Sequence, residues 1–183
     1  EVCRLAVGHR GAEVDLLSLT SYQFGLVLLD KDDIPLTKIS TFVDTTAQSH
    51  HPRFLEAVGD IDRMYLRTGC PPIFQYPVNR LHHIATTKPD IAQRVAHVLD
   101  SKAFLMHLLT GEFWLDENLA AMSGLYSLKL GGWWPAALAS VGLTESHLPR
   151  VCPIGAMAAR TTPRAEQLGL AEGIPVILAG NDQ

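Results

Sequence analysis

The stretch VDLLSLTSYQFGLVLLD, residues 14–30, sets the fold class of the chain. Its two ends, residues 14–21 and 25–30, are short, rich in Leu and Val, and bounded by polar or turn residues, which predicts two strands. Residues 37–44, TKISTFVD, follow a turn cluster at 31–35 and are rich in β-branched residues. We therefore expect a third strand there, paired in an antiparallel hairpin.

Helical patterns follow in the middle of the chain. Residues 89–110 are the clearest, with one face that runs from Ile91 to Leu109 and includes Lys102; Asp100-Ser101 could divide this stretch into two helices. Further helices are expected over residues 52–66 with a break at Gly59-Asp60, and over residues 76–84, 115–126, 133–141 and 164–170.

The chain closes on residues 175–179, PVILA, which have the length and composition of a buried strand. Strands at the start, helices in the middle and a strand at the end predict an α/β fold with a mixed sheet and flanking helices. Both ends look cut, because the chain lacks an initiator Met and stops directly after the last strand.

Composition excludes several classes of protein. Of 183 residues, 47% are hydrophobic and 19% charged, which argues against a disordered, collagen-like or coiled-coil chain. A net charge of −4 gives no broad basic field for nucleic acid or an anionic membrane. No apolar run reaches the roughly 18 residues of a membrane helix. Three widely spaced cysteines fit a reducing compartment, so we expect a cytoplasmic protein.

Two carboxylates stand out because each follows a predicted strand. Asp182 lies in a Gly-Asn-Asp-Gln turn, and Asp44 lies in Val-Asp-Thr-Thr. Ligands of open α/β sheets gather at the carboxyl ends of strands, where a carboxylate can act as a base or hold a metal. On local evidence alone, an Asx turn or a helix cap is the favoured interpretation of both.

The histidines and tryptophans give weaker signals. The pairs His50-His51 and His82-His83 are adjacent residues, which point apart, and no metal-binding spacing is present, so we expect solvated or capping histidines and no metal site. Trp133, Trp134 and Phe113-Trp114 could stack on a sugar, but core packing is the favoured role.

Taken together, several segments resemble the FGGY carbohydrate kinases, a family that includes xylulokinase, gluconokinase and glycerol kinase. LSLTSYQFG and LVLLDKDDIPL, residues 17–36, resemble the hairpin that carries Gln-Met-His-Gly and Asp-x-x-Gly-x-Pro-Leu. TFVDTT at 41–46 resembles Trp-x-Asp-x-Arg. The further matching segments are RTGCP at 67–71, YPVNRL at 76–81, KPD at 88–90, DSKAFL at 100–105, LLTG at 108–111, VGL at 141–143, LP at 148–149, GLAEGIPV at 169–176 and AGND at 179–182.

The resemblance implies a partial domain of the actin-like ATPase (ribonuclease-H-like) fold. Residues 1–183 would form the N-terminal sugar-binding lobe, without the opening Asp-x-Gly-Thr phosphate-loop hairpin and without the C-terminal ATP-binding lobe. The implied reaction is ATP-dependent phosphorylation of a small sugar with Mg²⁺, a ketopentose by preference and gluconate or a polyol as alternatives. The implied partners are the sugar, ATP and a second copy of the chain, with no nucleic acid and no membrane.

The resemblance also assigns roles to residues. Asp182 falls on the family's catalytic base, which accepts the proton of the attacking hydroxyl. The implied sugar contacts are Gln23, Phe24, Asp44, Gln75, Tyr76 and Gln183. The chain departs from the family where Tyr22 and Phe24 replace the Gln and His of Gln-Met-His-Gly and Thr46 replaces the Arg of Asp-x-Arg.

Two further hypotheses stay open beside the kinase. The departures at Phe24 and Thr46 would suit a non-catalytic sugar-binding or regulatory protein on the same fold. An unrelated α/β enzyme could use Asp44 and Asp182 as an acid–base pair, provided that the two carboxylates face each other across one cleft.

Overall fold

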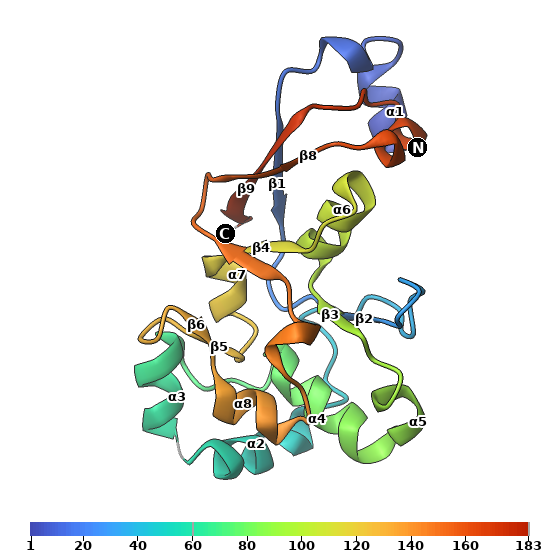
Figure 1. Ribbon diagram of the computed structural model, residues 1–183. Coiled ribbons are helices and arrows are strands. Elements are labelled where there is room, and N and C mark those ends of the chain that lie inside the picture. The colour runs from blue at the N-terminus through green and yellow to red at the C-terminus, as the bar shows by residue number, and fades with distance from the viewer. Residues whose placement is uncertain (60, 183) are drawn as a thin grey trace.

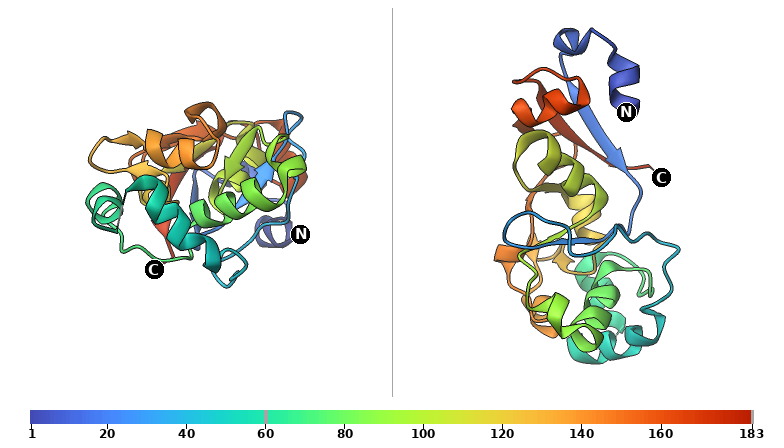
Figure 2. Two further views of the ribbon diagram at one scale, coloured as in Figure 1. Left: turned by 90° about the horizontal axis from the view of Figure 1, so that it is seen from below. Right: turned by 90° about the vertical axis from the view of Figure 1, so that its right-hand side faces the viewer.

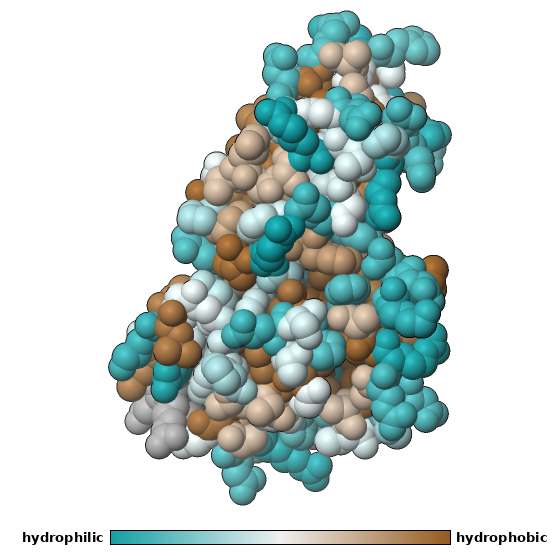
Figure 3. Space-filling model, in the orientation of Figure 1, coloured by the Kyte–Doolittle hydropathy of each residue, from teal (hydrophilic) through white to brown (hydrophobic). Residues whose placement is uncertain are grey.

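The computed structural model describes residues 1–59 and 61–182, excepting the side chains of 61–63. The molecule is elongated, with a small sheet at one end and most of the helices at the other (Figure 1). A side view shows the same division, with strands β1 and β9 running from the sheet-bearing end toward the helical end (Figure 2). In the space-filling view, apolar residues lie mainly between the two ends, and polar residues dominate the outer margins (Figure 3).

The sheet has three strands in the order β1-β9-β8. Strand β1 (Leu17–Ser21) lies parallel to β9 (Pro175–Asn181), and β8 (Met157–Arg160) lies antiparallel to β9. The predicted first and last strands are thereby confirmed, and they are direct neighbours although the helical region separates them in sequence. Parallel pairing places the carboxyl ends of both strands at one edge of the sheet.

The register between β1 and β9 shifts once. Leu19 pairs with Leu178, but Ser21 pairs with Asn181, so Ala179 and Gly180 together lie opposite the single residue Thr20. This is the arrangement of a β-bulge, which bends the strand that carries the extra residue.

Three two-stranded ladders complete the strand pairing. Strand β2 (Val27–Leu29) is antiparallel to β3 (His97–Leu99), β4 (Trp114–Asp116) is parallel to β7 (Arg150–Cys152), and β5 (Tyr126–Ser127) is antiparallel to β6 (Gly132–Trp133). Parallel and antiparallel pairs both occur, so the mixed sheet architecture expected from the sequence is confirmed.

The α-helices are α1 (Val2–Val7), α2 (His51–Val58), α3 (Ile61–Thr68), α4 (Pro77–Thr87), α5 (Pro89–Ala92), α6 (Ser101–Thr110), α7 (Glu117–Ala121) and α8 (Pro135–Ser140). Short 3₁₀ turns cover Gly11–Glu13, Gln48–His50, Glu145–His147 and Pro163–Leu168. Helix α6 begins at Asp100, whose carboxylate accepts from the Ala103 amide at 2.7 Å, and it ends at Gly111 with a left-handed φ of 76°.

Two apolar clusters form the core. The larger one joins β2 and β3 to α2, α4 and α8, and the smaller one lies between α6 and the β1-β9-β8 sheet. Helix α6 serves both, because Ala103 belongs to the larger cluster while Met106 and Leu109 belong to the smaller one.

Three sequence predictions of secondary structure were wrong. Residues 37–44 form no strand; Ser40 makes an isolated bridge to Leu26, and the apolar side chains of Phe42 and Val43 are exposed. The predicted hairpin is reduced to that bridge and one between Leu29 and Pro35, and the regular ladder of β2 is with β3.

The other two errors concern helices interrupted by strands. Residues 89–110 contain α5, β3 and α6, since Val98 and Leu99 are buried against β2 and Asp100 starts a new helix. Residues 115–126 contain the end of β4 and only a short helix, α7, which Asp116 caps through the Leu119 amide. The break expected in residues 52–66 is confirmed at Gly59, whose φ is 104°.

Candidate active site

The candidate site lies where the carboxyl ends of β1 and β9 meet. The Asp182 amide donates to the Ser21 carbonyl at 3.2 Å, and Asn181 Nδ2 donates to Gln23 Oε1 at 3.3 Å. The side chain of Asp182 is exposed. The structure therefore brings Asp182 beside the Tyr22–Gln23–Phe24 segment, at the edge of the sheet where ligands of α/β folds gather.

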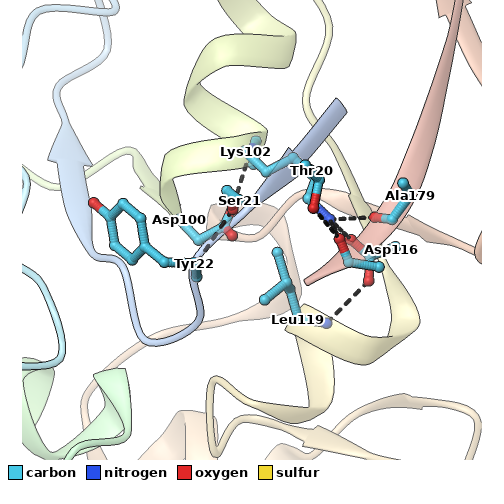
Figure 4. Close-up of polar contacts among 10 residues, drawn as sticks. Thr20, Ser21, Tyr22, Asp100, Lys102, Asp116, Leu119 and Ala179 are labelled. Atoms are coloured by element: carbon cyan, nitrogen blue, oxygen red, sulfur yellow. Dashed lines mark hydrogen bonds and ion pairs between the residues drawn. The ribbon is translucent and has the colours of Figure 1, made fainter. Parts of the chain in front are cut away.

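A buried ion pair contacts the carboxyl end of β9 (Figure 4). Lys102 Nζ lies 2.6 Å from Asp116 Oδ2, and both side chains are 0% exposed. The same ammonium donates to the carbonyls of Ala179 and Gly180, the second at 2.9 Å, and Thr20 Oγ1 donates to the Gly180 carbonyl at 2.9 Å. Lys102 thus binds both residues of the β9 bulge.

Sequence reasoning missed this pair as part of the site. Its signal was present, because Lys102 occupies the apolar face of a predicted helix, where a charged residue needs a partner. The partner, Asp116, lies in a stretch that was predicted to be helical throughout, and the pairing of β4 with β7 positions it.

Asp100 is a second buried carboxylate close to the site. Its Oδ1 accepts from the Ala103 amide, while its Oδ2 is buried without a hydrogen-bond partner among the described residues. Burial raises the pKa of Asp100 to about 7, although the bond from Ala103 acts in the opposite direction. Next to it, Ser101 Oγ donates to the Tyr22 hydroxyl at 2.6 Å, which ties the start of α6 to the segment after β1.

Phe24, the last residue of the Tyr22–Gln23–Phe24 segment, packs against Tyr76. Their ring centroids lie 5.3 Å apart in an edge-on arrangement, and Phe24 has a left-handed φ of 64°. Tyr76 is 1% exposed, and burial raises the pKa of its hydroxyl far above the usual range. The preceding residue, Gln75, is half-buried, and its Oε1 has no hydrogen-bond partner among the described residues. Gln183 lies outside the described residues.

Asp44 occupies a different place, in the loop between β2 and α2. Its Oδ1 accepts from the amide and the hydroxyl of Thr46 at 2.9 and 2.7 Å. Partial burial opposes ionisation, but the bonds from Thr46 prevail and lower the pKa of Asp44. Asp44 lines a cavity of about 200 Å³ with Arg80, His83 and Lys88, and no residue of β9 lines that cavity. Asp44 and Asp182 therefore do not line this cavity together.

Arg80 connects the two regions. This buried side chain donates to the Thr41 carbonyl at 2.7 Å and to the Phe24 carbonyl. Burial lowers the pKa of Arg80, and the charge of Asp44 opposes that effect. Arg80 therefore fixes the backbone of Phe24 relative to the loop that carries Asp44.

The two histidine pairs are buried or half-buried and contact one another, which differs from the expectation, whereas His147 is a capping histidine that accepts from the Thr144 amide. His50 is 9% exposed and contacts both members of the second pair, with its Nδ1 3.2 Å from His82 Nδ1 and its Nε2 3.1 Å from His83 Nδ1. Burial lowers the pKa of His50 and of His82. Among residues 1–59 and 61–182, no group of three His, Cys, Asp or Glu side chains is placed to hold a metal ion.

Two further predictions concern the tryptophans and membrane-spanning helices. Trp133 and Trp134 are buried in the larger core, in agreement with the favoured role in packing. None of the helices in the part that the structure describes has the length and apolar character required to cross a membrane.

The chain is similar to known carbohydrate kinases. Residues 4–183 match the model described as the FGGY family of carbohydrate kinases, N-terminal domain. A gluconokinase from Bacillus licheniformis is 25% identical over 175 residues, which cover 95% of this chain and 34% of that protein. An L-fuculokinase from Haemophilus influenzae is 37% identical over 127 residues, which cover 67% of this chain and 26% of that protein.

Solved structures show the same architecture. The crystal structure of a xylulose kinase from Rhodospirillum rubrum aligns with a TM-score of 0.81 at 26% identity, over 91% of this chain and 34% of that one. This agrees with the actin-like ATPase fold expected from the sequence. The chain spans about a third of the length of the gluconokinase and of the xylulose kinase.

Proposed function

The chain belongs to the FGGY family of carbohydrate kinases, and on that premise we propose that it is the sugar-binding part of an enzyme that phosphorylates a small sugar with ATP. The observation that carries this proposal is the position of Asp182. It follows the bulged strand β9 at the carboxyl edge of the sheet, where its exposed carboxylate is free to meet a sugar hydroxyl beside the Tyr22–Gln23–Phe24 segment.

Asp182 is proposed to act as the general base. As the sugar oxygen forms its bond to the γ-phosphorus of ATP and the bond from that phosphorus to the ADP oxygen breaks, the hydroxyl proton moves to the Asp182 carboxylate. The hydroxyl becomes strongly acidic only as the new bond forms, so a carboxylate of ordinary basicity is sufficient.

The sugar is proposed to lie between Asp182 and the segment after β1. Gln23 offers an amide that already contacts Asn181, and the buried Phe24–Tyr76 ring pair packs at the end of that segment. Gln75, whose Oε1 is buried without a hydrogen-bond partner among the described residues, is proposed as a further sugar contact. Asp44, across Arg80, and Gln183, which directly follows Asp182 in sequence, are proposed as further sugar contacts.

A ketopentose is the substrate that we propose first. A solved relative at 26% identity is titled a xylulose kinase, and a relative from Pasteurella multocida at 30% identity is named a probable L-xylulose kinase. Gluconate is the second candidate, because the gluconokinase of Bacillus licheniformis matches over 95% of this chain.

No group of three His, Cys, Asp or Glu side chains lies together among the described residues, so an all-protein cage for Mg²⁺ is not present there; Mg²⁺ in phosphotransferases is usually held by one or two carboxylates together with the phosphates of the nucleotide. We propose that parts of the protein outside this chain supply most of the contacts to the nucleotide and its metal, in keeping with the proposed place of this chain as the sugar-binding lobe. No step of the mechanism above is routed through the metal.

Sugar-dependent ADP release by the full-length protein tests this function. The panel holds xylulose, ribulose, gluconate, glycerol and erythritol, and each is assayed with the wild type, Asp182→Asn and Asp15→Asn. We expect activity with one sugar, a fall of about 10²–10⁴-fold in Asp182→Asn and no change in Asp15→Asn, an exposed carboxylate before β1. Sugar binding by calorimetry without ADP release would instead support the non-catalytic sugar-binding protein.

A further inference from the structure

One ammonium group binds both residues of the bulge in β9. Lys102 Nζ donates to the carbonyls of Ala179 and Gly180, the two residues that lie opposite Thr20, and its remaining bond goes to Asp116 Oδ2. An ammonium has three donors and no acceptor. All three of its donors are therefore in use, two of them on the irregular part of the strand (Figure 4).

The bulge lies directly before the proposed base. Its two residues, Ala179 and Gly180, directly precede the Asn181–Asp182 pair, which bonds to Gln23 and Ser21 across the edge of the sheet. A regular strand alternates its side chains between the two faces, so one inserted residue reverses the direction of every side chain that follows. The bulge thus decides on which side of the strand the Asp182 carboxylate emerges.

Net stabilisation is a poor explanation for this ion pair. Both side chains are fully buried, and the cost of removing two charges from water commonly cancels their attraction. The pair gives instead directional bonds to two carbonyls that the bulge removes from the ladder. It also joins three elements, since Asp116 Oδ1 caps α7 while Lys102 lies in the first turn of α6.

We propose that Lys102, held by Asp116, is a positioning residue that fixes the β9 bulge and thereby aims Asp182 at the sugar hydroxyl. The catalytic part of this inference rests on the proposed function, because it takes Asp182 as the base. The structural part, that Lys102 holds the end of β9 in one conformation, does not depend on the reaction.

The main variant removes both charges together. In Lys102→Met/Asp116→Asn the apolar chain keeps most of the volume of Lys102, and the Asn side chain can still cap α7 through the Leu119 amide. Phe54→Leu is the matched control for lost stability, because Phe54 is 0% exposed in α2, at the helical end far from β9 (Figure 1).

We expect kcat of the double variant in the full-length protein to fall by about 10²-fold, with KM for the sugar changed by less than about twofold. A small misplacement of a reacting group has this order of effect, and a loss confined to the transition state lowers kcat and kcat/KM equally. Phe54→Leu should lower the melting temperature and leave kcat as it is. A folded double variant with wild-type kcat would overturn the proposal.

Two further measurements keep the test decisive. Thr20→Val removes one bond to the Gly180 carbonyl from an exposed position, so it folds in any event, and we expect kcat to fall about threefold to tenfold. Amide hydrogen exchange at Asn181 and Asp182 should be faster in the double variant than in the wild type and unchanged in Phe54→Leu. If the double variant does not fold, Thr20→Val takes its place in this comparison.

Failure of this inference is distinguishable from failure of the proposed function. An inactive wild type, or full activity in Asp182→Asn, would refute the function and leave the exchange measurement to decide whether Lys102 fixes the strand. Exchange at Asn181 and Asp182 that stays at the wild-type rate would refute the positioning role, whatever the reaction.

Discussion

Replacing Asp100 by Asn is expected to stabilise the protein at high pH and to lose this advantage in acid. The Asp100 pKa is about 7 in the folded protein against an ordinary value of 3.8, because burial disfavours the charged carboxylate and its Oδ2 has no hydrogen-bond partner among the described residues. The folded protein therefore holds a proton between pH 3.8 and 7 that the unfolded chain has released. Since the folded state binds more protons, its stability falls as the pH rises through this window.

The size of the effect follows from the same two values. A pKa near 7 against 3.8 corresponds to at most about 4 kcal/mol of lost stability above pH 7. Asn keeps the side-chain oxygen that accepts from the Ala103 amide. It loses the attraction of a carboxylate to the helix N-terminus, about 0.3–1 kcal/mol. It also places an amide group where Oδ2 has no partner among the described residues. We therefore expect Asp100→Asn to be more stable than the wild type by about 1–3 kcal/mol at pH 8, and no more stable at pH 4.

Urea unfolding at several pH values, followed by the fluorescence of the buried Trp133 and Trp134, measures this difference. Asp32→Asn is the matched control, because Asp32 is exposed and bonds only to Lys31 through its carboxylate, so its substitution should leave the pH dependence as it is. A stability difference between Asp100→Asn and the wild type that stays constant from pH 4 to pH 8 would refute the assignment of a raised pKa to Asp100.

Gly124→Ala should destabilise the protein by about 2–4 kcal/mol, since φ is 76° and the new Cβ would lie 2.7 Å from Val78 Cγ1. Gly131→Ala is the control: its φ is 65°, but the new Cβ would meet open space, so the cost should be only about 1 kcal/mol. Thermal unfolding of both variants measures the difference. Arg80→Met should raise KM for the sugar more than it lowers kcat, because the Phe24 carbonyl loses its buried donor and Phe24 is a proposed part of the sugar site; equal KM values for variant and wild type would contradict this role.

The local patterns that the sequence predicted well are those that one element decides by itself. The apolar run of β9 and the break at Gly59 need no distant partner, and both were found where they were expected. The prediction of a strand over residues 37–44 was wrong because β-branched composition alone does not provide a neighbouring strand to pair with. Strand β2 has its full ladder with β3, which is distant in sequence, and only single bridges to Ser40 and Pro35.

The candidate site shows the same limit. Asp182 could be singled out because it follows a predicted strand, and the end of a strand can be predicted from one segment of sequence. Lys102 and Asp116 could not be paired, because they fell in two separate predicted helices, residues 89–110 and 115–126. The ladder of β4 with β7 is what brings Asp116 into position. The shift of register at Thr20 has no signature in either strand alone.

The two apolar clusters have a consequence for how the chain unfolds. Strands β1 and β9 belong to the smaller cluster, and α6, β4 and β7 contribute side chains to both. A domain of this kind opens in cooperative units whose free energies differ, and the unit with less apolar burial opens first. The edge that carries Asp182 therefore belongs to the unit of lower local stability, while the larger helical body stays folded as its foundation. Helix α6 and strands β4 and β7 are the elements through which the folded body restores that edge after each opening.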